Sequence, residues 1–320
     1  MRYPFVVTNK PLDKLHLYLT SYNMLLFPPE ISKAAESLYI SQPALSKYIT
    51  GLEKRMNLPL FNRIGNRFVL TYAGERYLAR AKEIAACRDS LERELQDIAG
   101  CNDGELKIAV PVIRGSHILP SVIPEFRKLY PHVRLTLNES DSQPLEKLLL
   151  DGDIDLAIIH LPIKNPAIHY TLIRKECLLM AVPQNNPLIK HGKIVDGYSF
   201  PWIDLSLFRN EDFILTKPNQ RTRQICDELF KKEKISPHII LCTANVETAV
   251  RLSAAEVGIS FAPETFIRFL HGESAARYFI IGDPIVTSDL VIAYRNGAYL
   301  STYAKAFIEI TQKVFAQTIL

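Results

Sequence analysis

The side chains best suited to reading another molecule are Gln42, Ser46 and Lys47, near the N-terminus of this 320-residue chain. Glutamine and serine can hydrogen-bond to the edges of DNA bases, and lysine can bind phosphate. Ser41 is a preferred N-cap residue, and Pro43 falls in the first helical turn, where a missing N–H costs nothing. We therefore expect a helix that begins after Ser41 and presents these polar side chains on its outer face.

Small and apolar residues on both sides of this cap predict two short helices that cross closely. Ala34, Ala35 and Leu38 precede the turn, and Leu45 and Ile49 follow it. A helix-turn-helix of this kind places its second helix in the major groove of DNA. Helix pairs with a cap between them also occur in proteins that bind no DNA, so the pair alone leaves both interpretations open.

The next segment predicts a short basic hairpin. Gly65-Asn66 is a turn dipeptide, and Phe68 and Leu70 alternate with polar neighbours. Between residues 40 and 70 one anion, Glu53, stands against five cations. These cations are Lys47, Lys54, Arg55, Arg63 and Arg67. Since the formal net charge of the whole chain is only +4, positive charge is concentrated here, and we interpret the hairpin as the wing of a DNA-binding domain.

This region resembles the DNA-binding domain of the LysR-type transcriptional regulators, a bacterial family. Residues 34–46 match the family signature AA-x-x-L-x-x-SQPALS, and residues 52–63 continue the family pattern. The resemblance implies that double-stranded promoter DNA is a partner, with RNA polymerase as a further one to consider. The residues implied at the DNA are Ser32, Ser41, Gln42, Pro43, Ser46, Lys47, Arg63 and Arg67.

A long helix is expected from Thr71 to Ile98, because this stretch has no proline and no glycine after Gly74. Residues recur along it at alternating intervals of four and three, as in two helices packed together. We interpret the stretch as a dimerisation helix; packing against its own domain is the alternative. The seam residues are Tyr77, Ala81, Ile84, Leu91, Leu95 and Ile98, with Arg88 interrupting them. The family resemblance implies homodimers that associate into homotetramers.

From residue 105 onward, strand-like and helix-like segments alternate, which predicts parallel sheets covered by helices. Strands are expected at 106–110, 133–137, 154–159, 178–182, 213–215, 238–241, 259–262 and 290–294, and helices at 118–130, 145–150, 221–232, 246–254 and 299 to about 316. Short motifs such as 152–158 and 258–263 resemble the effector-binding domain of the same family. The resemblance implies two α/β subdomains, like those of periplasmic solute-binding proteins, with a ligand cleft between them.

The expected fold is therefore an α/β chain with an α-rich winged helix-turn-helix ahead of a two-subdomain sensor. Residues 1–72 would form the DNA-binding domain, 73–100 the dimerisation helix and 101–320 the effector-binding domain. Within the last, subdomain I would comprise about 104–175 and 282–320, and subdomain II about 176–281. The chain departs from the family in its extended N-terminus, in a long connection at Asn23–Glu30 and in Glu256, which replaces a common glycine.

The effector is expected where strand ends and helix N-termini of both subdomains meet. Hydroxyl groups at helix starts, together with nearby cations, favour a small carboxylate or another oxyanion. Ordinary capped helix starts with solvated basic side chains are the alternative. The candidate effector-binding residues are Arg114, Ser116, His117, Ser140, Ser142, His160, Thr216, Lys217, Arg221, Thr243, Asn245, Phe261 and Pro263.

Other classes of protein find little support in the sequence. No GxSxG, HExxH or GxxxxGK[ST] motif is present, and the eight histidines are dispersed, so we expect no enzyme, cofactor or metal. The five cysteines lack CxxC spacing, and no secretory or membrane-spanning segment is evident, which favours a cytoplasmic protein. We predict a DNA-binding transcriptional regulator controlled by a small molecule. The alternative is a solute-binding protein or a small-molecule enzyme with an appended helical domain.

Overall fold

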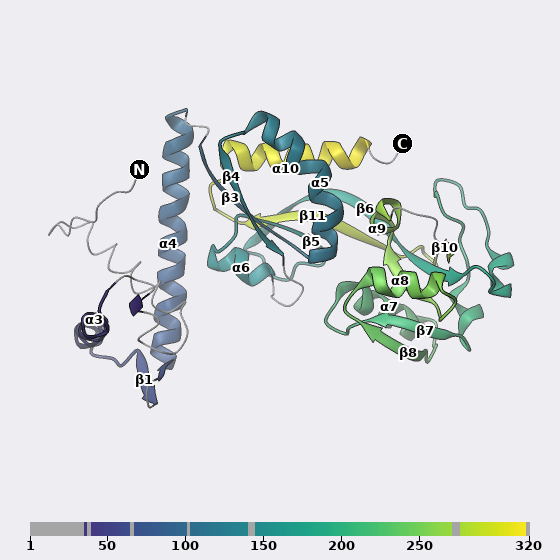
Figure 1. Cartoon of the computed structure of the whole chain (residues 1–320), viewed down its shortest axis with the longest axis horizontal. Coiled ribbons are helices and arrows are strands. Elements are labelled where there is room, and N and C mark those ends of the chain that lie inside the picture. The colour runs from purple at the N-terminus through teal and green to yellow at the C-terminus, as the bar shows by residue number, and fades with distance from the viewer. Residues whose placement is uncertain are drawn as a thin grey trace. The chain divides into compact units, whose positions relative to one another are not determined.

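The computed structural model describes residues 35–36, 40–64, 67–100, 103–139, 145–270 and 276–317, with the backbone alone of Arg67 and Gln317 (Figure 1). The chain divides into two compact units. The first comprises residues 1–95 with 150–153, and the second comprises residues 96–149 with 154–320. No helix in the described ranges is long and apolar enough to cross a membrane.

The first unit contains the expected second helix of the helix-turn-helix, α3 (Gln42–Met56). The Ser41 side chain accepts a hydrogen bond from the backbone N–H of Ala44 at 3.4 Å, so the predicted N-cap is confirmed. At the other end Asn57 takes a left-handed conformation with φ 52° and closes the helix. Leu45 and Ile49 are buried against Ala35, which leaves the polar side of α3 outward.

Strands β1 (Phe61–Ile64) and β2 (Arg67–Leu70) form the predicted antiparallel hairpin, whose turn lies outside the described residues. The Glu53 carboxylate of α3 accepts hydrogen bonds from the backbone N–H groups of Leu60 at 2.8 Å and Phe61 at 3.0 Å. The one anion of this basic region therefore fixes the start of the hairpin to α3.

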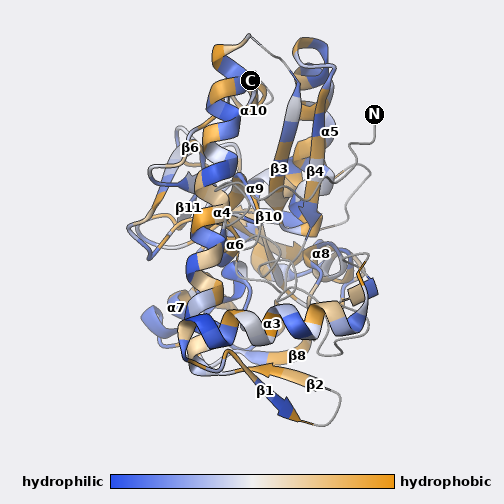
Figure 2. Cartoon of the chain, turned by 90° about the vertical axis from the view of Figure 1, so that its left-hand side faces the viewer, coloured by the Kyte–Doolittle hydropathy of each residue, from blue (hydrophilic) through white to orange (hydrophobic). Residues whose placement is uncertain are grey.

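Helix α4 (Tyr72–Ile98) confirms the predicted long helix and carries both hydrophobic and hydrophilic residues along its length (Figure 2). Gly74 is required at its start, because a Cβ there would lie 2.1 Å from the carbonyl oxygen of Leu60. Of the predicted seam, Ala81 is buried and Tyr77 half-buried, whereas four large apolar residues are exposed. Exposed fractions are 43% for Ile84, 54% for Leu91, 55% for Leu95 and 76% for Ile98.

The second unit has two lobes, and one long strand, β6 (Ile168–Pro183), runs through both of them (Figure 1). The sheet of the first lobe runs in the order β6-β11-β5-β3-β4. Its other strands are β3 (Gly104–Val110), β4 (Val133–Glu139), β5 (Leu156–His160) and β11 (Thr287–Arg295), of which β3 is parallel to β4 and β5. Its helices are α5 (Val112–Leu129), α6 (Leu145–Asp151) and α10 (Thr302–Gln317). Phe126 and Phe307 join α5 to α10 in the buried core, with ring centroids 5.5 Å apart.

In the second lobe the continuation of β6 pairs with β9 (Ser260–Pro263) and β10 (Ala276–Ile280), both antiparallel. A parallel pair, β7 (Asp212–Thr216) and β8 (His238–Thr243), adjoins them through a bridge between Phe213 and Ile259. The helices are α7 (Arg221–Lys232), α8 (Val246–Ala254) and α9 (Glu264–Phe269), and short 3-10 helices span Pro187–His191 and Leu205–Phe208. The core of this lobe is aromatic, with Phe213 stacked on Phe261 at 6.0 Å.

Three differences from the predicted elements matter for the site, and one of them is the presence of helix α9, which was not expected. Helix α5 begins at Val112, six residues earlier than expected, so Arg114 and Ser116 lie in its first turns and not in a preceding loop. The first half of β6, residues 168–177, was not predicted at all, because consecutive charged residues such as Arg174 and Glu176 are untypical of a strand. Pairing with β11 along nine residue pairs overrides that local preference.

Candidate effector cavity and candidate DNA-binding surface

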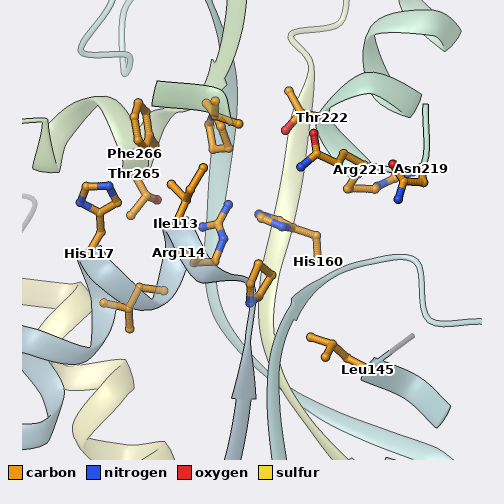
Figure 3. Close-up of a pocket in the computed structure, with 15 residues that line it drawn as sticks. Ile113, Arg114, His117, Leu145, His160, Asn219, Arg221, Thr222, Thr265 and Phe266 are labelled. Atoms are coloured by element: carbon orange, nitrogen blue, oxygen red, sulfur yellow. The ribbon is translucent and has the colours of Figure 1, made fainter. Parts of the chain in front are cut away.

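A cavity of about 240 Å³ lies in the second unit, where strand ends of the first lobe meet helix starts of the second (Figure 3). The residues that line it are Pro111, Ile113, Arg114, His117, Ile118, Leu145, His160, Asn219, Gln220, Arg221, Thr222, Val246, Pro263, Thr265 and Phe266. Most of the lining is apolar. The His117 ring stands edge-on to Phe266, with centroids 5.1 Å apart, and extends that apolar wall.

The polar part of the cavity is cationic. Arg114 comes from the first turn of α5 and Arg221 is the first residue of α7, and in Figure 3 the ring of His160 lies between them. Within the described part of the chain, the Nε of Arg221 and the Oε1 of Gln220 are buried without a hydrogen-bond partner. Arg221 thus lines the cavity and also carries a buried N–H that lacks an acceptor among the described residues.

Glu176, 1% exposed in the middle of β6, lies beneath these cations. One of its oxygens is 3.2 Å from Nη1 of Arg114 and 2.5 Å from Nε2 of His160. The other accepts hydrogen bonds from the backbone N–H of Thr265 at 3.1 Å and from the Thr265 hydroxyl. Burial alone would raise the pKa of Glu176, but Arg114 and the hydrogen bonds from His160 and Thr265 outweigh it and hold the pKa at about 2. The carboxylate is therefore ionised.

The surroundings of His160 favour its neutral form. Burial and the positive charge of Arg114 lower the pKa of its imidazole, and Arg221 acts in the same direction, against the opposing effect of Glu176. A neutral ring with its proton on Nε2 can donate to the carboxylate of Glu176. Groups from both lobes therefore meet in one cluster beside the cavity, in which the charges of Arg114 and Glu176 balance each other.

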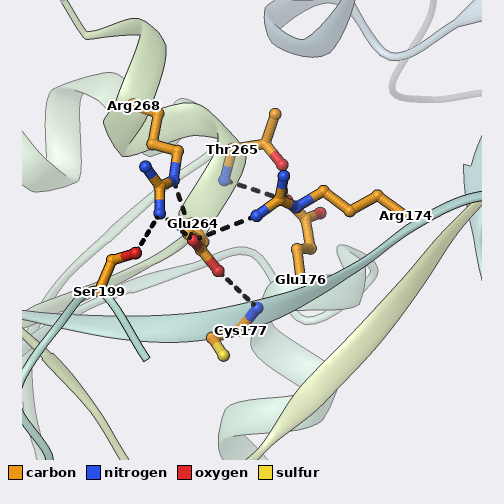
Figure 4. Close-up of polar contacts among 7 residues, drawn as sticks. All are labelled: Arg174, Glu176, Cys177, Ser199, Glu264, Thr265 and Arg268. Carbon is orange, nitrogen blue, oxygen red and sulfur yellow. Dashed lines mark hydrogen bonds and ion pairs between the residues drawn. The ribbon is translucent and has the colours of Figure 1, made fainter. Parts of the chain in front are cut away.

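A second buried glutamate, Glu264 at the start of α9, forms a separate cluster with residues of β6 and α9 (Figure 4). Its carboxylate accepts hydrogen bonds from the backbone N–H of Cys177 at 3.3 Å, from Nη2 of Arg174 at 3.4 Å and from Nε of Arg268 at 2.9 Å. Glu176 on β6 binds the N–H of Thr265 on α9, and Glu264 on α9 binds the N–H of Cys177 on β6. Each carboxylate thus accepts a hydrogen bond from the backbone of the other element, and the pair holds β6 and α9 together.

Five of the predicted effector residues line this cavity, namely Arg114, His117, His160, Arg221 and Pro263. Ser140 and Ser142 fall outside the described residues. Ser116 is exposed, and its hydroxyl donates to the carbonyl oxygen of Val112 at 3.1 Å, because α5 has already begun there.

The other predicted effector residues do not line the cavity. Lys217 and Asn245 are exposed, and Asn245 caps α8 by accepting hydrogen bonds from two backbone N–H groups. The Thr243 hydroxyl accepts from the backbone N–H of Asn245 at 3.0 Å. Thr216 is 3% exposed, and Phe261 belongs to the aromatic core.

The cavity also uses residues that sequence reasoning missed. Asn219, Gln220 and Thr222 flank the predicted Arg221, so the predicted strand-to-helix turn was an available signal. Thr265 and Glu176 had no recognisable signal in the sequence. Thr265 lines the cavity and Glu176 binds its backbone N–H only because β6 passes beside α9. No group of three metal-ligating side chains occurs among the residues that the structure describes.

The predicted DNA-contacting residues gather on α3 and the hairpin. Ser41, Gln42, Pro43 and Lys47 are exposed, and Ser46 is half-buried. Nη2 of Arg63 donates to the Ser46 hydroxyl at 3.5 Å, which brings the hairpin next to the outer face of α3. That contact joins α3 to the β1–β2 hairpin, the two elements predicted to contact DNA. Ser32 and the side chain of Arg67 lie outside the described residues.

Two family models match the chain. Residues 30–75 match the model for the bacterial regulatory helix-turn-helix protein of the lysR family, and residues 99–316 match the LysR substrate binding domain. An uncharacterized HTH-type transcriptional regulator of Bacillus subtilis (strain 168), YcgK, is 30% identical over 296 residues, which covers 90% of each chain.

Solved structures show the same fold. A full-length OxyR variant from Pseudomonas aeruginosa superposes with a TM-score of 0.69 at 20% identity, over 94% of this chain and 97% of that one. The regulatory domain of CcmR from Synechocystis PCC6803, in complex with 2-PG, gives a TM-score of 0.59 at 19% identity, over 67% of this chain and 99% of that one.

Proposed function

Because the chain belongs to the LysR family of transcriptional regulators, with its effector-binding domain, we propose that an organic anion bound in the cavity controls its binding to promoter DNA. The observation that supports an anionic effector is Arg221, whose Nε is buried and has no hydrogen-bond partner among the described residues. A carboxylate or another oxyanion supplies both the missing acceptor and a counter-charge.

The position of Arg221 adds to this preference. It is the first residue of α7, and Asn219, Gln220 and Thr222 from the same helix start also line the cavity. The unpaired backbone N–H groups and the positive end of the helix dipole favour an anion at such a start.

The cavity can transmit binding because both lobes form it. Arg114 and His160 come from the first lobe, and Arg221 and Phe266 from the second. A ligand that contacts both lobes stabilises whichever relative arrangement satisfies all these groups at once, and so shifts the population towards it. The effector thus acts by selecting one conformation of the sensor.

DNA reading is assigned to α3 and the β1–β2 wing, and assembly to α4. The exposed apolar residues Ile84, Leu91 and Leu95 recur at seven- and four-residue spacing on α4, as expected where a second copy of the helix would pack. We expect Leu91→Glu to separate the oligomer and abolish DNA binding while the second unit stays folded, because a charge would be buried in the helix contact. Sedimentation of the wild type and the variant measures the oligomeric state. An unchanged oligomer in the variant would contradict the assignment of the seam.

Calorimetry with the full-length protein tests the effector assignment, using probe compounds that share a cyclohexane ring. Cyclohexanecarboxylate should bind more tightly than the neutral carboxamide and than cyclohexylammonium, and Arg221→Gln should weaken the carboxylate by about tenfold or more. Arg251→Gln is the matched control, since Arg251 lies on α8 but points to the surface, where it pairs with Glu247. Equal binding of carboxylate and ammonium would refute the proposal.

Selection of bound duplexes from a random DNA pool separates a regulator from a solute-binding protein or an enzyme. The full-length protein should enrich a defined sequence motif. Recovery of random sequence only, at every salt concentration, would contradict the regulator assignment.

A further inference from the structure

We propose that the cavity selects an organic anion with a single negative charge, and that the buried carboxylate of Glu176 excludes doubly charged anions. The inference rests on the proposed function, since it takes the same cavity as the effector site. It goes further by assigning the charge of the effector and the residue that sets it.

Arg114 already has a counter-charge inside the protein. Its Nη1 lies 3.2 Å from the carboxylate of Glu176, and the side chains are 12% and 1% exposed. A pair held this far from water is screened little and behaves as one neutral unit towards a ligand. Arg114 can still donate a hydrogen bond to an effector, but its positive charge is balanced.

Arg221 is then the cation that remains for the ligand. Among the described lining residues the permanently charged side chains are Arg114 and Arg221, and no carboxylate is among them. Arg221 forms no ion pair with any described residue, and its Nε is buried without an acceptor. Of the neighbouring histidines, His160 has its pKa lowered by burial and by the positive charge of Arg114, and the ring of His117 packs edge-on against Phe266.

The cluster of Arg114, Arg221 and Glu176 therefore carries one net positive charge. One carboxylate on the ligand compensates it. A second carboxylate would be buried next to Glu176 without a partner, which is strongly disfavoured in a site removed from water. The apolar walls formed by Ile113, Val246 and Phe266 suit the uncharged body of the ligand. The class that fits is a monocarboxylate with a compact apolar group.

The wild-type protein provides the first test without any substitution. Calorimetry compares cyclohexanecarboxylate with cis-cyclohexane-1,2-dicarboxylate at about pH 8, where both carboxyl groups of the second probe are ionised. We expect the monocarboxylate to bind at least about tenfold more tightly. Equal or tighter binding of the dicarboxylate, or no measurable binding of either, would overturn the inference.

Glu176→Gln tests the residue assigned to this selectivity. The amide keeps a hydrogen-bond acceptor for Thr265 but removes the charge that balances Arg114, so the cavity gains one net positive charge. The preference for the monocarboxylate should fall by about tenfold or reverse. Glu264→Gln is the matched control, because Glu264 is also a buried glutamate but pairs with Arg174 and Arg268, which do not line the cavity.

The outcomes separate this inference from the proposed function. If Arg221→Gln weakens the monocarboxylate but Glu176→Gln leaves the ratio of the two affinities unchanged, the cavity binds anions and only the charge assignment is wrong. If Arg221→Gln changes neither affinity, the cavity is not the anion site and both proposals fail. Should Glu176→Gln not fold, the wild-type ratio still decides the preference for one charge.

Discussion

The outer face of α3 and the floor of the cavity use similar polar side chains under opposite conditions. Gln42 and Lys47 are exposed to water, whereas Arg114 and Glu176 are almost completely removed from it. Exposed charges act through a field that salt screens, so their individual contributions are small and tolerant of substitution. Buried charges must be matched one by one, and removing one partner leaves the other uncompensated. The two regions should therefore differ in how strongly a single substitution acts.

The largest effect is expected from Glu176→Ala. The variant leaves Arg114 and His160 buried without their carboxylate and removes the acceptor of the Thr265 N–H. We expect the free energy of unfolding of the second unit to fall by about 3–5 kcal/mol in urea denaturation. A loss below about 1 kcal/mol, comparable with that of a surface ion pair, would remove the contrast between the two regions.

A somewhat smaller effect is expected from acid. The pKa of Glu176 is lowered from 4.5 to about 2, so its contribution is complete above about pH 4.5 and is lost as the pH falls through 2. The pKa of His160 is lowered below 6.5, so the unfolded chain takes up this proton first and stability begins to decline below that pH.

Urea midpoints measured across the acid range test both groups. The contribution of Glu176 is on the order of 3 kcal/mol. In Glu176→Gln the decline between pH 4.5 and 2 should flatten, while the decline that begins near pH 6.5 persists. Identical pH profiles for the wild type and the variant would show that folding does not lower the pKa of Glu176.

Gln42→Ala should have an intermediate effect, confined to sequence discrimination. Loss of a base contact costs about 1–3 kcal/mol at one base pair and little on random DNA. Binding to the selected motif, to single-base variants of it and to random duplex measures the difference. An equal loss on all of these duplexes would mean that Gln42 binds the backbone.

The smallest effect is expected from Arg63→Ala on the hairpin. As a phosphate contact, Arg63 should contribute about equally to every sequence, and its loss should reduce the slope of log affinity against log salt by about 0.9. Titrations at several salt concentrations measure this slope. An unchanged slope would place Arg63 away from the phosphates, held by Ser46 and by the ring of Phe68 at 5.1 Å.

The contrast between exposed and buried groups also explains what the sequence could predict. Ser41 caps α3 through a residue three positions away, so the start of that helix is encoded locally. The cavity is assembled from segments more than a hundred residues apart in the chain, such as those of Arg114 and Arg221. Arg221, named from a predicted helix start, lines the cavity, and so does His117, although α5 begins earlier than expected. Glu176 gave no signal, because a charged residue inside a strand becomes meaningful only once its partners are known.

The register of β6 with β11 has a consequence for the modularity of the sensor. Cys177, where β6 leaves the first lobe, is the direct antiparallel partner of Thr287, where β11 re-enters it. The chain thus departs and returns at adjacent positions, and the whole second lobe is an insertion at the tip of a hairpin in the first. Domains with neighbouring ends are those that recombination can insert, exchange or delete without disturbing the host fold. The same scaffold can therefore acquire a different half-site for its ligand while the other half keeps its sheet intact.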